Sequence, residues 1–312
     1  MNKSEHLKEV LETHKMSKIQ SLVDKHKEKR TEIEDALVEH YGSNIYNVFM
    51  SGSFAKHTAT NIKFDMDIVV PFKKDSFDTL QEMFDDVHEF LSEKFSDAEE
   101  VRKQKVSIGI TFKKDEEDDQ VQIDVVPGRE LNLDDYKDSH DLNLYFNEDN
   151  WGFKKGTWMK TNIHDQIDHI KGKNSEREII RLLKVWKKRH NKDYKSFMFE
   201  LFVIKAFTDY DDSNDLWDRL KHAMRYIADN VTDEKFKLVD PGNSNNDVLS
   251  SMDSTKKQNL ANDMNNIISN IEYDDENIKV YFKINEKFKS SDKERGFGEN
   301  VASYPPTGKR FG

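Results

Sequence analysis

Two aspartates interrupt an apolar run that is otherwise typical of a buried strand. The segment FDMDIVVPF, residues 64–72, sets Asp65 and Asp67 among aliphatic and aromatic side chains. Residues two apart on a strand point to the same face, so the two carboxylates are expected to project together. Two like charges with buried neighbours repel each other and are poorly hydrated, and a divalent cation would neutralise them. The segment therefore predicts a strand that carries a metal site.

A third carboxylate has a matching context. Asp124 stands alone in the apolar segment VQIDVVPG, residues 121–128, which a pairing sheet can bring beside the first strand. The chain has 60 acidic residues among 312, so an acidic pair by itself would usually be a solvated one. The apolar surroundings are what distinguish these three aspartates. Three hard oxygen ligands suit Mg²⁺, and two such ions can activate an attacking hydroxyl and stabilise a leaving pyrophosphate.

Small residues lie just upstream of the acidic strand. The segment MSGSF places Gly52 and Ser53 directly after an expected strand. Backbone amides and a hydroxyl can approach phosphate oxygens there, and a helix starting at this point would add its positive N-terminal end. Lys56 and His57 follow, either as exposed helix residues or as phosphate contacts. A Gly-Ser pair alone is uninformative, whereas the pair together with three strand-borne aspartates is a specific combination.

The apolar periodicity predicts a mixed α+β lobe in the first half of the chain. Helical spacing runs from residue 4 to about 40, and a second helix is expected over 78–95. β-branched and aromatic residues cluster in four expected strands, with an acidic hairpin turn at 113–120 between the last two. These strands are 46–53, 64–72, 105–112 and 121–127.

Beyond Pro127 the pattern becomes helical. Four amphipathic or apolar segments predict helices at 176–190, 196–210, 215–231 and 259–271. We therefore expect a catalytic-type lobe over 1–160, a helical lobe over 161–288 and a long N-terminal helix that bridges the two. The tail, 289–312, is polar and rich in Gly and Pro, and we expect it to be flexible.

The composition excludes several classes of function. A formal net charge of −11 argues against a general nucleic-acid coat. The chain has no cysteine, so it has neither disulfides nor thiolate metal sites, which fits a cytoplasmic protein. No segment is apolar over the length of a membrane span, and no membrane partner is expected.

These motifs resemble a known enzyme family. Gly52, Ser53, Thr58, Asp65, Asp67 and Asp124 resemble the signature of the polymerase-beta-type nucleotidyltransferases. More narrowly, the chain resembles the CD-NTases of bacterial CBASS anti-phage systems, which are related to cyclic GMP–AMP synthase and the oligoadenylate synthases. Further matches are LLKVWKKRH with Lys184, KSFMFELFVIKAF with Ser196 and Phe197, and LVDPGNSNND. The resemblance spans residues of about 45 to 250.

The resemblance implies a fold and a set of site residues. The fold would be the polymerase-beta-like one, with a mixed-sheet catalytic lobe and a helical lobe. The three aspartates would hold two Mg²⁺ ions, for which Mn²⁺ can substitute. Gly52, Ser53, Lys184 and Ser196 would grip the donor triphosphate, and Phe197 would stack on the donor base. The residues themselves leave alternatives open: a solvated basic face for Lys184, a helix cap for Ser196 and a core position for Phe197.

The implied function is synthesis of a cyclic di- or trinucleotide second messenger from NTPs, with ATP as an expected substrate. One alternative is a related enzyme that makes linear oligonucleotides or modifies a tRNA or protein. A second is a catalytically inactive regulatory module. The lack of cysteine argues against zinc-dependent DNA sensing. The C-terminal Gly312 is compatible with conjugation by a ubiquitin-transfer-like priming enzyme, or it simply ends a disordered tail.

Overall fold

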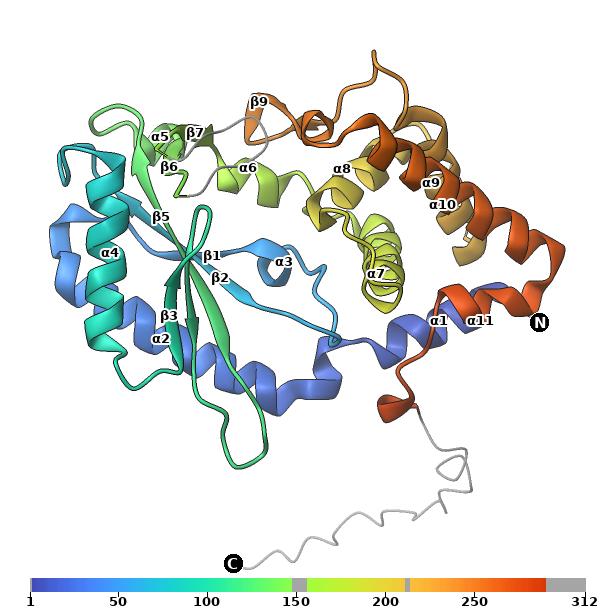
Figure 1. Cartoon of the computed structure of the whole chain (residues 1–312), viewed down its shortest axis with the longest axis horizontal. Helices are drawn as coiled ribbons and strands as arrows, with labels where there is room; N and C mark the ends of the chain where they lie inside the picture. Colours follow the sequence, from blue (N-terminus) through green and yellow to red (C-terminus); the bar gives the residue numbers. More distant parts are fainter. Residues whose placement is uncertain (1, 148–155, 211–213, 290–312) are drawn as a thin grey trace, which may run out of the picture.

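A seven-stranded mixed sheet stands beside a bundle of helices in the computed structural model, which describes residues 2–147, 156–210 and 214–289 (Figure 1). The central pair, β2 and β5, is parallel, and the other strand pairs are antiparallel. β5 is flanked by β2 on one side, and on the other side by β4 along its first half and by β6 along its second half. The strands are β1 Phe49–Ser51, β2 Met66–Phe72, β3 Glu100–Lys103, β4 Ile108–Thr111, β5 Gln122–Glu130, β6 Leu142–Tyr145 and β7 Trp158–Thr161. The α+β class expected from the sequence is confirmed.

The two faces of the sheet carry different side chains because of the two-residue strand period. Ile68 and Val70 point to the face covered by α2 (Gln20–Tyr41) and α4 (Leu80–Lys94). We call this face the back of the sheet. Val69 and Val126 point to the front, where they pack with Ile163 of α6 (Ile163–Asp168). Asp67 and Asp124 share the front face with these valines.

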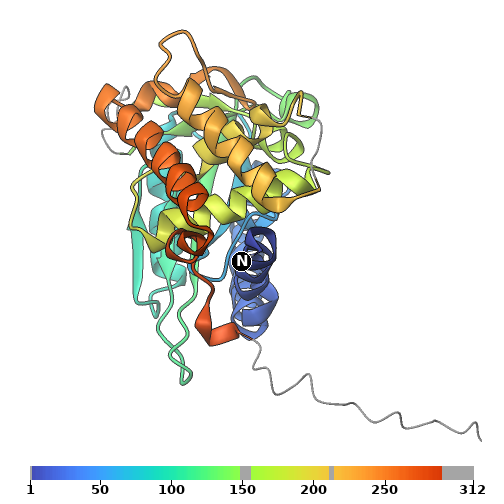
Figure 2. The same cartoon turned by 90° about the vertical axis from the view of Figure 1, so that its right-hand side faces the viewer.

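The helical part is built around α8 (Ser196–Ala206), which is mostly apolar and, apart from its exposed Lys205, largely buried. A helix with this pattern can only be stable when other helices surround it. The surrounding helices lie on the right of Figure 1, and this side of the molecule faces the viewer in Figure 2. They are α7 Asn174–Arg189, α9 Leu216–Asn230, α10 Ser254–Tyr273 and α11 Ile278–Tyr281.

The single long N-terminal helix expected from the sequence is wrong in one respect. The segment forms α1 (Lys3–Thr13) and α2, separated by a 3₁₀ turn at Met16–Ile19. α1 contributes to the helical core and α2 to the core behind the sheet, so the break falls between two hydrophobic clusters. The side chain of Asn61 donates to the carbonyls of Thr13 and Lys15 at 3.0 and 3.2 Å. These contacts satisfy carbonyl groups that the break frees, so tertiary structure overrides the helical pattern.

Several short elements have no clear signal in the sequence. β3 reads EVRK and lies half-exposed at one sheet edge, whereas β6 pairs with both β5 and β7. The others are α3 Gly52–Ala55, α5 Tyr136–Ser139 and the hairpin of β8 Val239–Asp240 with β9 Asn243–Asp247. The boundaries expected at 160 and 288 remain a prediction. The tail from 290, including Gly312, lies outside the described residues.

No helix in the described ranges combines the length and apolarity that crossing a membrane would require.

Candidate active site

The parallel register of β2 and β5 brings two of the three aspartates side by side. Asp67 and Asp124 are direct partners in this register, and Ser51 at the end of β1 pairs with Asp67 from the other side. Asp65 lies one residue before β2 begins, so it precedes the strand and does not belong to it as the sequence pattern suggested. The strand pairing expected from the sequence is confirmed, while the catalytic role of the three residues remains a prediction.

Gly52 lies directly against the carboxylate of Asp67. Its φ of +67° is a backbone conformation that favours glycine, and a Cβ built on it would come within 1.7 Å of Asp67 Oδ2. The chain turns here from β1 into α3, a single helical turn closed by a bond from the Thr58 amide to the Ser53 carbonyl at 2.9 Å. The Gly-Ser motif therefore adjoins the acidic pair, as the sequence analysis expected.

Asp124 is oriented by a residue that the sequence analysis missed. Gln104 donates from Nε2 to Asp124 Oδ1 at 3.0 Å, and it accepts from the Ser107 hydroxyl at 3.1 Å. The amide of Gln104 lies over Gly109, where a Cβ would approach Gln104 Nε2 to 2.2 Å. Gly109 is the β4 partner of Asp124, so the missing side chain leaves room for this contact. Gln104, Gly109 and Asp124 come together only in the folded chain, so the sequence gives no signal for this contact.

Burial makes the acidic pair costly to ionise. It raises the pKa of Asp67 to about 7, with the negative charges of Asp65 and Asp124 adding to the effect. Burial also raises the pKa of Asp124 to about 6, again helped by Asp65. Lys56 and Lys184 act in the opposite direction on Asp67. The site is thus a concentration of negative charge that a cation would relieve.

Carboxylate oxygens are the hard donors that Mg²⁺ and Mn²⁺ prefer, so Asp65, Asp67 and Asp124 fit a divalent ion.

A tighter acidic cluster lies elsewhere. Within the described residues, Asp115, Glu117 and Asp119 are the three whose oxygens all lie within 4.8 Å of one another. Lys25 donates to all three at 2.5–2.8 Å. That cluster, on the hairpin between β4 and β5, is already partly neutralised by one ammonium group.

Lys184 reaches from the helical bundle toward the Gly-Ser segment. Its Nζ donates to the carbonyl of Thr58 at 2.8 Å, and burial lowers its pKa to about 8. The negative charges of Glu200 and Asp65 partly oppose that lowering. This inward position differs from that of Lys188, which lies exposed on the same helix. The alternative of a solvated face therefore does not hold for Lys184.

Ser196 opens α8 without capping it. The N-cap is Lys195, whose side chain makes no capping hydrogen bond. The Ser196 hydroxyl instead accepts from Lys187 Nζ at 2.9 Å, and the same ammonium donates to the carbonyl of Tyr194 at 2.6 Å. Lys187 is thus a second inward cation of α7 that the sequence did not single out.

Lys56 is buried, so the alternative of an exposed helix residue does not hold for it. Its Nζ lies 2.9 Å from Glu200 Oε1, and the two side chains are only 8% and 6% exposed. The same ammonium lies 4.5 Å from the ring centre of Phe197, so one face of that ring is already covered. The pair joins the end of α3 to α8 across the two hydrophobic clusters. By contrast, His57 is exposed.

The buried pair gives a direct test of the contact between sheet and helices. We expect Glu200→Gln or Lys56→Met to lower the free energy of unfolding by about 3–5 kcal/mol, because each leaves one buried charge unpaired. The double variant Lys56→Met/Glu200→Leu should recover most of this loss. Urea denaturation of the variants measures both effects.

The matched control is Glu32→Gln, which removes an exposed partner of Lys29. This change should alter the free energy of unfolding by less than about 1 kcal/mol. Single variants of the buried pair that behave like the control would contradict the structure.

Comparisons with known proteins find nucleotide synthases among the similar chains. No family model matches the chain. Cyclic AMP-AMP-AMP synthase of Escherichia coli (strain MS 115-1) is 25% identical over 250 residues, which cover 70% of this chain and 74% of that protein. The structure of E. coli MS115-1 CdnC with ATP matches with a TM-score of 0.68 at 18% identity, covering 90% of this chain and 95% of CdnC.

Two further structures extend the agreement. CdnC in complex with HORMA-deltaN matches with a TM-score of 0.62 at 19% identity, over 83% of this chain and 89% of that one. The CD-NTase CdnG of Bradyrhizobium diazoefficiens in complex with GTP matches with a TM-score of 0.65 at 11% identity, over 90% and 95%. The chain is therefore similar in sequence to a cyclic AMP-AMP-AMP synthase, and it has the fold of the CD-NTases CdnC and CdnG.

Proposed function

We propose that this protein is a cytoplasmic, magnesium-dependent synthase that joins NTPs into a cyclic di- or trinucleotide second messenger for anti-phage defence. The observation that carries the proposal is the pairing of Asp67 with Asp124 beside Gly52, with Lys184 reaching the same segment from the helices. The name of the curated relative, cyclic AMP-AMP-AMP synthase, makes ATP the first substrate to test.

The acidic residues supply the metal-binding part of the mechanism. Asp65, Asp67 and Asp124 would hold two Mg²⁺ ions, which neutralise the donor triphosphate and lower the pKa of the acceptor hydroxyl. Gln104 fixes the orientation of Asp124 through its bond to Oδ1. Asp124 would then take the proton of the acceptor hydroxyl.

The donor triphosphate would lie between the Gly-Ser turn and α7. The Gly52 backbone has no side chain to block a phosphate oxygen, and Ser53 offers a hydroxyl at the start of α3. Lys184 and Ser196 approach from the helical side, where Lys187 holds the Ser196 hydroxyl. Phe197 can stack on the donor base only with the face that Lys56 leaves open.

The reaction itself is an in-line displacement at phosphorus. The acceptor hydroxyl oxygen forms a bond to the α-phosphorus of the donor, the bond from that phosphorus to the bridging oxygen breaks, and pyrophosphate leaves. A linear product that rebinds with its free hydroxyl facing its own triphosphate end would close into a ring by the same step.

CdnC forms a complex with HORMA-deltaN, and we propose that a protein partner also binds this chain. Priming through Gly312 stays a prediction.

The decisive experiment incubates the protein with radiolabelled NTPs and Mg²⁺, followed by phosphatase. Phosphatase-resistant small products are expected, and mass spectrometry then gives bases and ring size. Asp65→Ala/Asp67→Ala should abolish them without loss of folding, since repelling carboxylates are removed. Products that are all phosphatase-sensitive would indicate linear synthesis, and no product with any NTP would favour the inactive module.

Gly52→Ala tests the contact between the turn and Asp67. The added Cβ would displace the carboxylate that it meets at 1.7 Å, so we expect at least a hundredfold loss of synthesis, as for a misplaced catalytic group. Gly172→Ala is the matched control, because Gly172 also has a positive φ, +77°, but nothing lies within 4 Å of a Cβ there. If both variants lose synthesis equally, the loss comes from backbone strain at a positive φ and not from displacement of the Asp67 carboxylate.

The lowered pKa of Lys184 predicts a pH dependence. Below about pH 8 the side chain is charged, and above it the charge is lost, so kcat/KM for ATP should fall about tenfold between pH 7 and pH 9. Lys184→Arg remains charged throughout this range and should show a flatter profile, even if its rate is lower. Identical profiles for the two proteins would assign the pH dependence to another group.

A further inference from the structure

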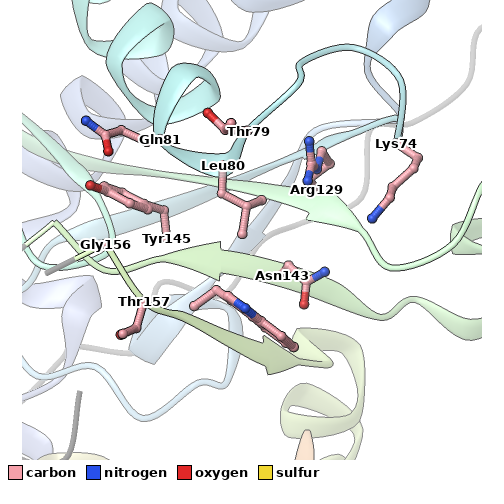
Figure 3. A pocket seen from close by; sticks show the side chains of 10 residues that line it. Lys74, Thr79, Leu80, Gln81, Arg129, Asn143, Tyr145, Gly156 and Thr157 are labelled. Carbon is pink, nitrogen blue, oxygen red and sulfur yellow. The ribbon is translucent and has the colours of Figure 1, made fainter. Parts of the chain in front are cut away.

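A cavity of about 540 Å³ lies on the back of the sheet, between the start of α4 and strands β5 to β7 (Figure 3). Arg129, which lines it, is five residues beyond Asp124 on β5. At about 3.3 Å per residue the two are roughly 16 Å apart, and the odd spacing points them to opposite faces. The cavity is therefore separate from the candidate active site.

Two buried polar groups in this cavity lack a hydrogen-bond partner. Arg129 and Asn143 face each other across the β5–β6 register. Arg129 donates from Nη1 to the carbonyl of Phe77 at 2.5 Å, but its Nε has no partner within the described residues. Asn143 is 9% exposed, and within the same part of the chain its Oδ1 also has none. Buried groups without partners are uncommon because each is costly, so a donor and an acceptor together point to a ligand.

The cavity also holds a cation without a partner. Lys74 lines it, and its ammonium has no hydrogen bond or ion pair in the described ranges. In Figure 3 this ammonium points into the same space as Arg129 and Asn143. The negative charges of Asp78 and Glu82 lie near Arg129 and offset part of its positive charge. The cavity therefore favours a ligand with a small negative charge. Glu82 already accepts from the Thr79 amide at the start of α4.

Aromatic rings supply the apolar part of the cavity. Trp158 is 58% exposed although it lines the cavity, and Tyr145, its partner across the β6–β7 register, is buried beside it. Leu80 lies on the opposite wall, at the start of α4 (Figure 3). An exposed tryptophan at the mouth of a small cavity offers a free face on which a flat ring can stack.

We propose that this cavity binds a mononucleotide at a second, non-catalytic site. The phosphate lies between Lys74 and Arg129, and the base stacks on Trp158. Asn143 Oδ1 accepts a hydrogen bond from a ribose hydroxyl or a base N–H. Lys74 and Arg129 both offer N–H donors to one phosphate group, and the volume lies in the range usual for small-molecule sites.

Titration calorimetry with AMP tests this site, in EDTA so that metal-dependent binding in the active site is suppressed. The full-length protein should bind one AMP. Lys74→Ala and Trp158→Ala should each weaken binding about tenfold. Both side chains lie at the surface of the cavity, so folding should be unaffected, whereas Arg129 is left intact because it also holds the Phe77 carbonyl.

Matched controls separate this site from other surfaces. Lys73→Ala changes the neighbouring lysine, which lines a different cavity, and Tyr273→Ala removes an aromatic ring that is 91% exposed. Neither should change the affinity for AMP, and Lys184→Ala should leave it intact as well. The proposal is overturned if the protein binds no AMP in EDTA, if Lys74→Ala and Trp158→Ala bind as tightly as the unmodified chain, or if Lys184→Ala abolishes binding.

Discussion

Repulsion between buried carboxylates is the constraint on which the rest of this structure depends. Asp67 and Asp124 sit side by side because the hydrophobic packing of β2 and β5 fixes their register, and neither strand can slip without exposing its apolar face. The strand packing thus holds together two groups that would separate in water. The glycines at 52 and 109 keep the space around these carboxylates open.

The cations that face this charge come from the other half of the fold. Lys184 and Lys187 project from α7, and Lys56 is tied to α8 through Glu200. Glu200 is the charged residue buried in the otherwise apolar α8, so its place there is stabilised by Lys56. Positive charge is therefore set against the acidic strands by helix packing, before any substrate binds.

The sequence predicted the parts of this site that follow strand or helix periodicity. The acidic strands, the approach of Asp124 to the first strand and the Gly-Ser turn could be anticipated, because an acid inside an apolar run has no other ready explanation, whereas the parallel direction of the pairing could not. Gln104 and Glu200 could not, since a glutamine in a loop and a glutamate in a helix look ordinary until their partners are known. The break after Thr13 was hidden for the same reason, because Asn61 is 48 residues away in the chain.

The divided N-terminal helix has a mechanical consequence. α1 packs in the helical core and α2 in the core behind the sheet, so any rotation of one core relative to the other would bend the turn at Met16–Ile19. The carbonyls of Thr13 and Lys15 accept hydrogen bonds from the Asn61 side chain, so the α-helical hydrogen-bond pattern is interrupted at this turn. A few degrees of rotation at this joint would be magnified along the 22-residue arm of α2 into a change in the gap between cations and carboxylates.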